Sequence, residues 1–235
     1  MFTESAEFYD AIYSFKDYVA EATQIAARVR SVRADAQTVL DVACGTGEHA
    51  RLLAERHRFE VDGLDIDPGL LRLAREKHPS GHFFEADMSD FVLERRYDAI
   101  ICLFSSIGYL VTLERVTRAL VCFRQHLGLN GAVLVEPWFP PGALDTSRVF
   151  RFNGTHRGMH VTRTSRNEVD GRISRLYFEY EIDGPDGKRR ATEVHELGLF
   201  THDEMSMAFK NAGLSAQFDP VGLSGRGLWA ATESA

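Results

Sequence analysis

A short apolar run that ends in a glycine turn most constrains the fold of this chain. Residues 38–43 read Thr-Val-Leu-Asp-Val-Ala, and the turn Cys44-Gly-Thr-Gly47 then leads into a helical pattern over residues 49–55. β-Branched and apolar residues bounded by glycine are typical of a buried strand. Glycine allows the tight turn that follows. The segment therefore predicts a strand, a turn and a helix in direct succession.

The same alternation continues through the first half of the chain. Further strands are predicted over residues 60–65, 82–86, 97–104 and 132–136, and helices over residues 17–32, 68–77 and 113–127. Strands that alternate with helices favour right-handed crossovers between parallel strands. The predicted fold class is α/β, with a Rossmann-like, doubly wound and mostly parallel sheet.

The pattern changes after residue 137. Residues 159–168, 172–182 and 189–199 alternate in part between apolar and polar, with turn sequences at 169–171 and 184–187. Such runs predict an antiparallel three-stranded insertion. A helix over residues 201–212 and strands over 214–221 and 227–232 then resume the first pattern. We therefore predict an α/β core made of residues 1–138 and 200–235, with residues 139–199 as an insertion that covers the substrate site.

Composition excludes several classes of function. No run approaches the eighteen consecutive apolar residues typical of a membrane helix, and 34 acidic against 27 basic residues give a charge of −7, which disfavours nucleic acid as a partner. The N-terminal residues include acids and lack the basic start of a secretory signal, so we expect a cytoplasmic protein. Three cysteines without a Cys-x-x-Cys pair predict reduced thiols and no metal site.

Two acidic residues follow the ends of successive predicted strands. Asp65 lies eighteen residues after Gly47, and Asp87 follows the next strand. An acid at the first position can accept hydrogen bonds from ribose hydroxyls, and an acid at the second can accept one from the exocyclic amine of adenine. Because the ends of parallel strands meet at one edge of a sheet, the sequence predicts an adenosine site there.

The glycine loop is compatible with two adenosine cofactors. Gly45-Thr-Gly-Glu-His-Ala50 fits the Gly-x-Gly-x-x-Ala pattern of dinucleotide sites, which leaves an NAD-dependent oxidoreductase as an alternative. Asp41 stands just before this loop, where a fixed negative charge repels a pyrophosphate but can orient the ammonium of an amino acid. S-adenosylmethionine fits this arrangement better than NAD.

Longer strings carry a family resemblance. Leu40-Asp-Val-Ala-Cys-Gly-Thr-Gly47 resembles motif I of the class I S-adenosylmethionine-dependent methyltransferases. Leu103-Phe-Ser-Ser-Ile-Gly-Tyr-Leu110, Val135-Glu-Pro-Trp138 and Ser224-Gly-Arg-Gly-Leu228 resemble the N,N-dimethyltransferases of dTDP-linked amino sugars in antibiotic pathways. The likeness runs almost end to end. It implies the class I methyltransferase fold, S-adenosylmethionine as cofactor with S-adenosylhomocysteine as product, a dTDP-linked amino sugar as substrate, and a homodimer.

The motif residues and the resemblance together predict the cofactor contacts. The resemblance implies that Met88 and Leu103 clasp the adenine. The predicted contacts are Tyr9, Asp41, Ala43, Cys44, Gly45, Thr46, Gly47, Asp65, Ile66, Asp87, Met88 and Leu103.

The substrate contacts follow from the same resemblance. Arg226, flanked by two glycines, is implied to bind the pyrophosphate, and Trp138 or Phe139 to stack on thymine. Further candidates for polar contacts with the substrate are Arg163 and Arg175, on predicted strands, and His195.

Tyr109 stands where some members of that family have histidine, so an obvious neutral base is absent at this position. Methyl transfer from a sulfonium mainly requires alignment of the reacting atoms and exclusion of water. Our hypothesis is that the hydroxyls of Tyr109 and Tyr13 accept a hydrogen bond from the amine and orient its lone pair.

Several alternatives stay open at this point. The methyl acceptor could be another small-molecule amine or hydroxyl, and the chain could be a binding module without catalytic activity. The sequence does not decide between a 3-amino and a 4-amino sugar, between one and two methyl groups, or between antibiotic pathways.

Overall fold

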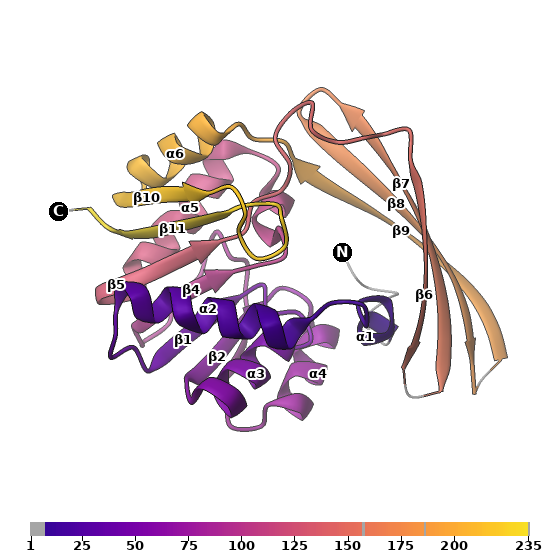
Figure 1. Cartoon of the computed structure of the whole chain (residues 1–235), viewed down its shortest axis with the longest axis horizontal. Helices are drawn as coiled ribbons and strands as arrows, with labels where there is room; N and C mark the ends of the chain where they lie inside the picture. The colour runs from indigo at the N-terminus through magenta and orange to yellow at the C-terminus, as the bar shows by residue number, and fades with distance from the viewer. Residues whose placement is uncertain (1–7, 157, 186, 235) are drawn as a thin grey trace.

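The predicted alternation of strands and helices appears as one large sheet with helices on both faces (Figure 1). The computed structural model describes residues 8–156, 158–185 and 187–234. The strands of this sheet are β1 (Thr38–Val42), β2 (Glu60–Asp65), β3 (Phe83–Glu85), β4 (Tyr97–Cys102), β5 (Leu127–Val135), β10 (Leu214–Asp219) and β11 (Leu228–Glu233). The helices are α1 (Tyr9–Ile12), α2 (Tyr18–Val32), α3 (Glu48–His57), α4 (Pro68–Lys77), η2 (Ser106–Leu110), α5 (Leu113–Gln125) and α6 (His202–Asn211).

The strand order confirms the doubly wound architecture. In the described part of the chain the order is β10-β11-β5-β4-β1-β2-β3. Strand β1 pairs in parallel with both β2 and β4, whereas β11 is antiparallel to its two neighbours. Successive side chains of β1 point to opposite faces, so Leu40 packs with α5 and α6 while Val39 packs with α2, α3 and α4. Both faces of the sheet are therefore covered.

The glycine turn after β1 has the geometry that the sequence predicts. Gly45 and Gly47 have φ angles of +57° and +73°, in the left-handed region that side chains disfavour. A Cβ on Gly47 would also lie 2.9 Å from the Cβ of Ala74 in α4. Glycine at position 47 thus lets α3 begin directly behind the loop.

A second sheet stands beside the carboxyl ends of the parallel strands. Its strands are β6 (Val149–His156), β7 (Met159–Asp170), β8 (Ile173–Gly184) and β9 (Gly187–Gly198), antiparallel in that order. The sequence predicts three strands here, and the described residues form four. All four fall within the predicted insertion, and the boundaries at residues 139 and 199 stay predictions.

The additional strand is β6. Its centre, Asn153-Gly154, is a pair typical of turns, so the local pattern does not indicate a strand. In the structure Gly154 lies against α1, where an added Cβ would be 2.0 Å from the carbonyl oxygen of Ala11. The close approach of a second backbone explains the glycine within this strand.

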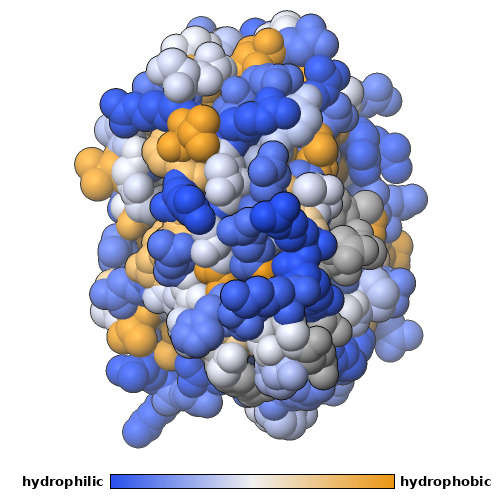
Figure 2. Space-filling model, turned by 90° about the vertical axis from the view of Figure 1, so that its right-hand side faces the viewer, coloured by the Kyte–Doolittle hydropathy of each residue, from blue (hydrophilic) through white to orange (hydrophobic). Residues whose placement is uncertain are grey.

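The two faces of the second sheet differ. On the inner face, Phe178, Tyr180 and Ile182 pack against Phe8 and Ile12 at the start of the described chain. The outer face, which Figure 2 shows, is mostly hydrophilic, with isolated hydrophobic side chains. The inner face is therefore turned toward α1 and the large sheet. No helix among the described residues has the length and apolar character needed to span a membrane.

Candidate active site

A cavity of about 800 Å³ lies between the carboxyl ends of the parallel strands and the inner face of the second sheet. Residues from both sheets line it, together with Tyr9 of α1 and Tyr13, which directly follows that helix. A smaller adjoining cavity of about 40 Å³ lies behind the glycine loop, and the two share Tyr9, Ala43 and Gly45. Both lie at the edge of the sheet where ligands of doubly wound folds bind.

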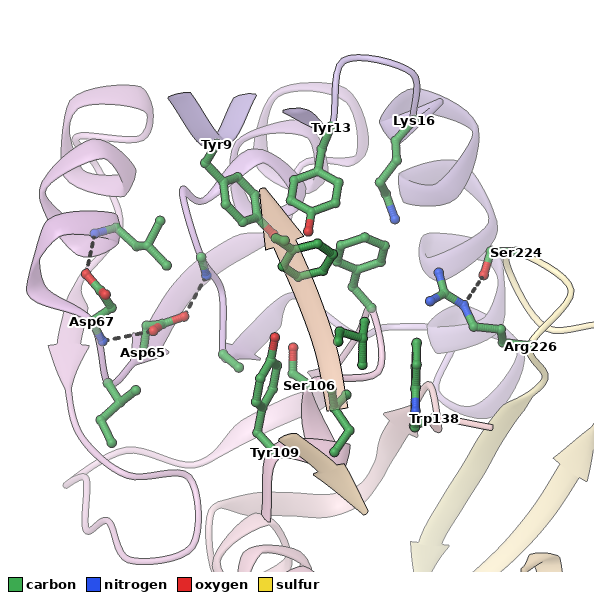
Figure 3. Close-up of a pocket in the computed structure, with 18 of the residues that line it drawn as sticks. Tyr9, Tyr13, Lys16, Asp65, Asp67, Ser106, Tyr109, Trp138, Ser224 and Arg226 are labelled. Atoms are coloured by element: carbon green, nitrogen blue, oxygen red, sulfur yellow. Dashed lines mark hydrogen bonds between the residues drawn. The ribbon is translucent and has the colours of Figure 1, made fainter. Parts of the chain in front are cut away.

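Asp65, at the end of β2, lies at one side of the large cavity (Figure 3). Its Oδ2 accepts a hydrogen bond from the backbone N–H of Gly45 at 2.8 Å, and its Oδ1 accepts one from Asp67 at 3.0 Å. Burial raises the pKa of this carboxyl group above its usual value. Each carboxylate oxygen can accept two hydrogen bonds, so both retain capacity for a ligand hydroxyl.

Asp41 is more deeply buried, and one of its oxygens lacks a donor. The residue is 2% exposed, and no described residue donates a hydrogen bond to its Oδ2. Burial raises the pKa of this carboxyl group to about 7. The side chain faces the small cavity beside Gly45, Thr46 and Leu103. A buried acid without a donor is suited to an incoming ammonium group, such as that of the methionine part of S-adenosylmethionine.

Asp87 lines the large cavity with Met88, but its carboxylate has protein partners. Oδ1 accepts hydrogen bonds from the N–H and the hydroxyl of Ser89 at 2.8 and 2.7 Å, and Oδ2 accepts one from Arg115 at 2.7 Å. Burial alone would raise the pKa of Asp87, but these hydrogen bonds lower it below its usual value. Contact between Asp87 and an adenine stays a prediction.

Three tyrosines surround the middle of the cavity. Tyr9 at the start of α1 and Tyr13 just after its end have ring centroids 4.6 Å apart, and Tyr109 approaches from η2 on the opposite side. In Figure 3, Tyr13 and Tyr109 point their hydroxyls into the space between Asp65 and Arg226. Burial raises the pKa of all three phenols, which are therefore protonated at neutral pH.

Cationic and aromatic side chains lie at the other side of the cavity. Arg226 donates from Nε to Ser224 Oγ at 3.2 Å, lies 3.6 Å from Glu136 and sits 5.1 Å over the ring of Phe104. Trp138 also lines this side. Figure 3 shows Arg226 and Trp138 across the cavity from Asp65.

The turn after β4 gives a structural role to two motifs of the sequence, residues 103–110 and 135–138. Phe104 and Ser105 have positive φ angles of 53° and 63°, which side chains rarely adopt. Glu136 accepts a hydrogen bond from the N–H of Phe104 at 2.7 Å, and the hydroxyl of Ser105 donates to the carbonyl of Pro137 at 2.7 Å. These bonds to the segment after β5 hold Phe104 at the cavity wall.

The structure brings most of the predicted cofactor residues together. The large cavity is lined by Tyr9, Ala43, Gly45, Asp65, Ile66, Asp87 and Met88. The small cavity adds Asp41, Cys44, Thr46 and Leu103. Gly47 lines neither of them and supports the close packing of α3 on α4.

The predicted substrate residues divide into two groups. Trp138, Arg163 and Arg226 line the large cavity. Arg175 does not line the cavity. Leu176 and Phe178 of the same strand face the cavity, and because successive side chains of a strand point to opposite faces, Arg175 points away from it. Its guanidinium instead pairs with Glu196 and Asp170 at 2.7 and 3.2 Å.

Phe139 and His195 also lie outside the lining. Phe139 packs against Trp138, with ring centroids 4.8 Å apart. His195 is 1% exposed and lies behind Tyr109, whose hydroxyl is 2.8 Å from its Nδ1. Neither side chain reaches the cavity surface.

Some of the residues that line the cavity are not predicted from the sequence. Lys16 lies 3.8 Å over the ring of Phe104 and forms an ion pair with Glu21 at 3.0 Å. Burial lowers the pKa of Lys16. Arg115 reaches the cavity from α5. Only the structure shows that Lys16 faces the site. Among the described residues, no group of three or more His, Cys, Asp or Glu could hold a metal ion.

Comparisons with known proteins show which family this chain is similar to. Residues 39–131 match a family model described as a methyltransferase domain. The chain is 40% identical over 229 residues to a dTDP-3-amino-3,6-dideoxy-alpha-D-glucopyranose N,N-dimethyltransferase of Streptomyces fradiae, covering 96% of this chain and 89% of the relative. It is 34% identical to a dTDP-4-amino-2,3,4,6-tetradeoxy-D-glucose N,N-dimethyltransferase of Saccharopolyspora spinosa, with coverage of 96% and 91%.

Two solved structures also match this chain over nearly its whole length. The crystal structure of Streptomyces venezuelae DesVI matches with a TM-score of 0.92, 36% identity and 99% coverage of both chains. The S-adenosylmethionine-bound amino pentose methyltransferase CalS10 of calicheamicin biosynthesis in Micromonospora echinaspora matches with a TM-score of 0.86, 34% identity and 97% coverage of both. The chain therefore belongs to the class I S-adenosylmethionine-dependent methyltransferases, in the family of the dTDP-amino-sugar N,N-dimethyltransferases.

Proposed function

We propose that this enzyme adds one or two methyl groups to the amine of a dTDP-linked amino-deoxysugar in an antibiotic pathway. The observation that carries the proposal is the two-ended cavity, with Asp65 at one side, Arg226 at the other and three tyrosines between them. An adenosine suits the acidic end, and a pyrophosphate suits the guanidinium. The relatives in the comparisons act on dTDP-linked sugars with amines at either C3 or C4.

The residues present fit S-adenosylmethionine. Asp41 offers a buried carboxylate oxygen to the ammonium, and Asp65 offers two oxygens with remaining capacity to the ribose. The N-terminus of α3, just behind the glycine loop, suits the carboxylate of the same ligand. When bound, S-adenosylmethionine supplies a methyl group that its sulfonium already activates for displacement.

The chain itself provides alignment and a dry site. Tyr9 of α1 and Tyr13 just after it cover the cavity, and Phe104 and Trp138 add apolar walls. Arg226 would hold the nucleotide end of the substrate, so that the sugar amine reaches the hydroxyls of Tyr13 and Tyr109. Holding the acceptor nitrogen in line with the methyl group accounts for much of the rate enhancement in such a displacement.

Replacement of Arg226 tests the proposed substrate. We expect Arg226→Ala to raise KM for the dTDP-amino sugar about 30-fold or more, since a hydrogen bond to a charged group contributes about 1.5–3 kcal/mol. The affinity for S-adenosylmethionine, measured by calorimetry, should change less than about twofold.

Arg175→Ala is the matched control, because this arginine on β8 does not line the cavity and pairs with Glu196 on the protein surface. It should leave KM nearly unchanged. An unchanged KM in Arg226→Ala would contradict the proposal and favour an acceptor without phosphate.

The proposal also keeps four expectations from the sequence. They are a cytoplasmic location, a homodimer, no nucleic-acid partner and no membrane partner.

A further inference from the structure

His49 is a buried histidine at the wall of the small cavity. It is the second residue of α3, it is 9% exposed, and it lines this cavity together with Asp41. Its Nε2 lies 2.8 Å from Oε2 of Glu21 on α2. The ring of Tyr18, also on α2, packs edge-on against the imidazole, with centroids 5.0 Å apart. Glu21 and Tyr18 therefore fix the imidazole at the cavity wall.

The charge of Glu21 sets the direction of its hydrogen bond with His49. Burial alone would raise the pKa of Glu21, but the hydrogen bond with His49 and the charge of Lys16 lower it below its usual value. Lys16 forms an ion pair with the other oxygen of Glu21, Oε1, at 3.0 Å. An ionised carboxylate only accepts hydrogen bonds, so Nε2 of His49 donates. In the neutral imidazole, Nδ1 is then an acceptor.

Two acceptors at the wall of the small cavity have no donor in the protein. Nδ1 of His49 has no partner among the residues that the structure describes, and the same holds for Oδ2 of Asp41. His49 acts electrostatically on Asp41, so the two groups lie near each other. Two acceptors at a space of about 40 Å³ are matched by a small group with at least two donors.

We propose that Nδ1 of His49 accepts a hydrogen bond from the ammonium of S-adenosylmethionine, beside Asp41, and that Glu21 is the positioning residue for His49. This inference rests on the cofactor part of the proposed function and not on the methyl acceptor. A primary ammonium has three N–H donors, so it can donate to Oδ2 of Asp41 and to Nδ1 of His49 at the same time. A bound ammonium also disfavours a second positive charge beside it, which keeps the imidazole neutral.

The carboxylate of the same ligand has other donors. The first N–H groups of α3 have no partner within the helix, and Gly47 at its N-cap offers no side chain to accept from them. These donors suit a negative group, whereas Asp41 and the neutral His49 offer acceptors. The two ends of the amino acid are therefore matched by different parts of the site.

Three thioethers that differ at the amino-acid end separate the possible contacts of His49. S-adenosylhomocysteine carries both the ammonium and the carboxylate, its decarboxylated form carries the ammonium alone, and methylthioadenosine carries neither. We expect His49→Phe, which keeps an aromatic ring beside Tyr18, to lower the affinity for the first two about tenfold in calorimetry. The affinity for methylthioadenosine should change less than about twofold, because that ligand does not reach His49.

His57→Phe is the matched control, because His57 is the last residue of the same helix and lines neither cavity. All three affinities should equal those of the unmodified protein. A loss in His49→Phe with S-adenosylhomocysteine alone would assign His49 to the carboxylate. An equal loss with all three ligands would show a purely structural role. Either result, or no loss with any ligand, would overturn the proposal.

Nitrogen NMR of histidine-labelled protein tests the same contact without a change at His49. In the complex with S-adenosylhomocysteine, we expect a neutral His49 with its proton on Nε2. The signal of Nδ1 should shift more with this ligand than with methylthioadenosine. An imidazolium, or a proton on Nδ1, in this complex would overturn the proposal.

Glu21→Gln tests the positioning role. The amide can donate as well as accept, so part of His49 should carry its proton on Nδ1 instead of Nε2. The affinity for S-adenosylhomocysteine should then fall about threefold or more, while that for methylthioadenosine stays within about twofold. An unchanged tautomer and affinity would show that Glu21 does not position His49. Failure to methylate any dTDP-amino sugar, by contrast, would overturn the proposed acceptor and leave these binding results in place.

Discussion

Two buried aspartates at neighbouring strand ends differ in their surroundings. Asp65 accepts hydrogen bonds from two backbone N–H groups, whereas one oxygen of Asp41 has no donor among the described residues. Position at the end of a strand is visible in the sequence, but the partners of each carboxylate are not. The consequence is that ionisation of Asp41 is costly until a cation arrives.

Asp41→Asn should therefore shift stability and cofactor affinity in opposite directions. The pKa of Asp41 is about 7 in the fold against 3.8 in an unfolded chain, so its ionisation removes stability as pH rises from about 4 to 7. Without ligand, the variant should gain on the order of 1–3 kcal/mol at pH 8 and little at pH 4 in urea unfolding. Its affinity for S-adenosylmethionine should fall about tenfold or more.

Asp98→Asn is a control for which we expect the opposite change in stability at pH 8. Although burial raises the pKa of Asp98, hydrogen bonds from the N–H groups of Gln37 and Thr38 lower it below its usual value. Ionised Asp98 thus contributes stability above pH 4, and the variant should lose stability at pH 8 without a change in cofactor affinity. If Asp41→Asn proves less stable than the unmodified protein at pH 8, the description of Asp41 as an unpaired buried acid is wrong.

How well the sequence places a single residue depends on the secondary structure that holds that residue. Asp41, Gly45 and Asp65 are found in the site because a strand end and a glycine turn fix their positions locally. Arg175 and His195 lie in long antiparallel strands, where the facing side depends on register with the neighbouring strand. The alternation pattern of one strand does not decide which of its faces meets the cavity.

At the level of elements, α1 depends on a small polar cluster. Lys77, the last residue of α4, donates to Asp10 of α1 at 2.7 Å and to Thr46 of the glycine loop at 2.8 Å. The hydroxyl of Thr46 also donates to Asp10 at 2.9 Å. These bonds hold α1, and with it Tyr9 and Tyr13, over the cavity. A helix of four residues has little stability of its own.

Lys77→Met should loosen this cover. We expect the affinity for S-adenosylmethionine to fall about five- to tenfold, with faster amide exchange in α1 and a change in unfolding free energy below about 1 kcal/mol. Arg72→Met is the control on the same helix, because its ion pair with Glu76 is exposed to solvent. Equal affinities in the two variants would show that the cluster does not hold α1 for binding.

Two of the elements that the sequence did not predict, α1 and β6, share a cause. The four residues of α1 are too few for a helical period to appear, and β6 has a turn-like Asn-Gly pair at its centre. Each is stabilised by the other and by the second sheet, since Phe8 and Ile12 pack on its inner face while Gly154 lies against Ala11. Longer elements such as α2 and α5 carry enough apolar periodicity to be found from sequence.

For the molecule as a whole, two sheets enclose one cavity. The large sheet provides the acids at its strand ends, and the second sheet provides the opposite wall and the buried side chains behind Tyr109. The sequence predicts both parts and their order along the chain. How they meet depends on contacts between residues far apart in sequence, such as Tyr109 with His195.

Mass spectrometry of the reaction products tests the central claim most directly. The enzyme would be supplied with S-adenosylmethionine and a panel of dTDP-3-amino and dTDP-4-amino sugars, each beside the same amino sugar without the nucleotide. The account predicts a gain of one or two methyl groups on one dTDP-linked isomer and no comparable gain on the free sugars. Equal methylation of free and dTDP-linked sugars, or no methylation of any dTDP sugar while S-adenosylmethionine binds, would contradict it.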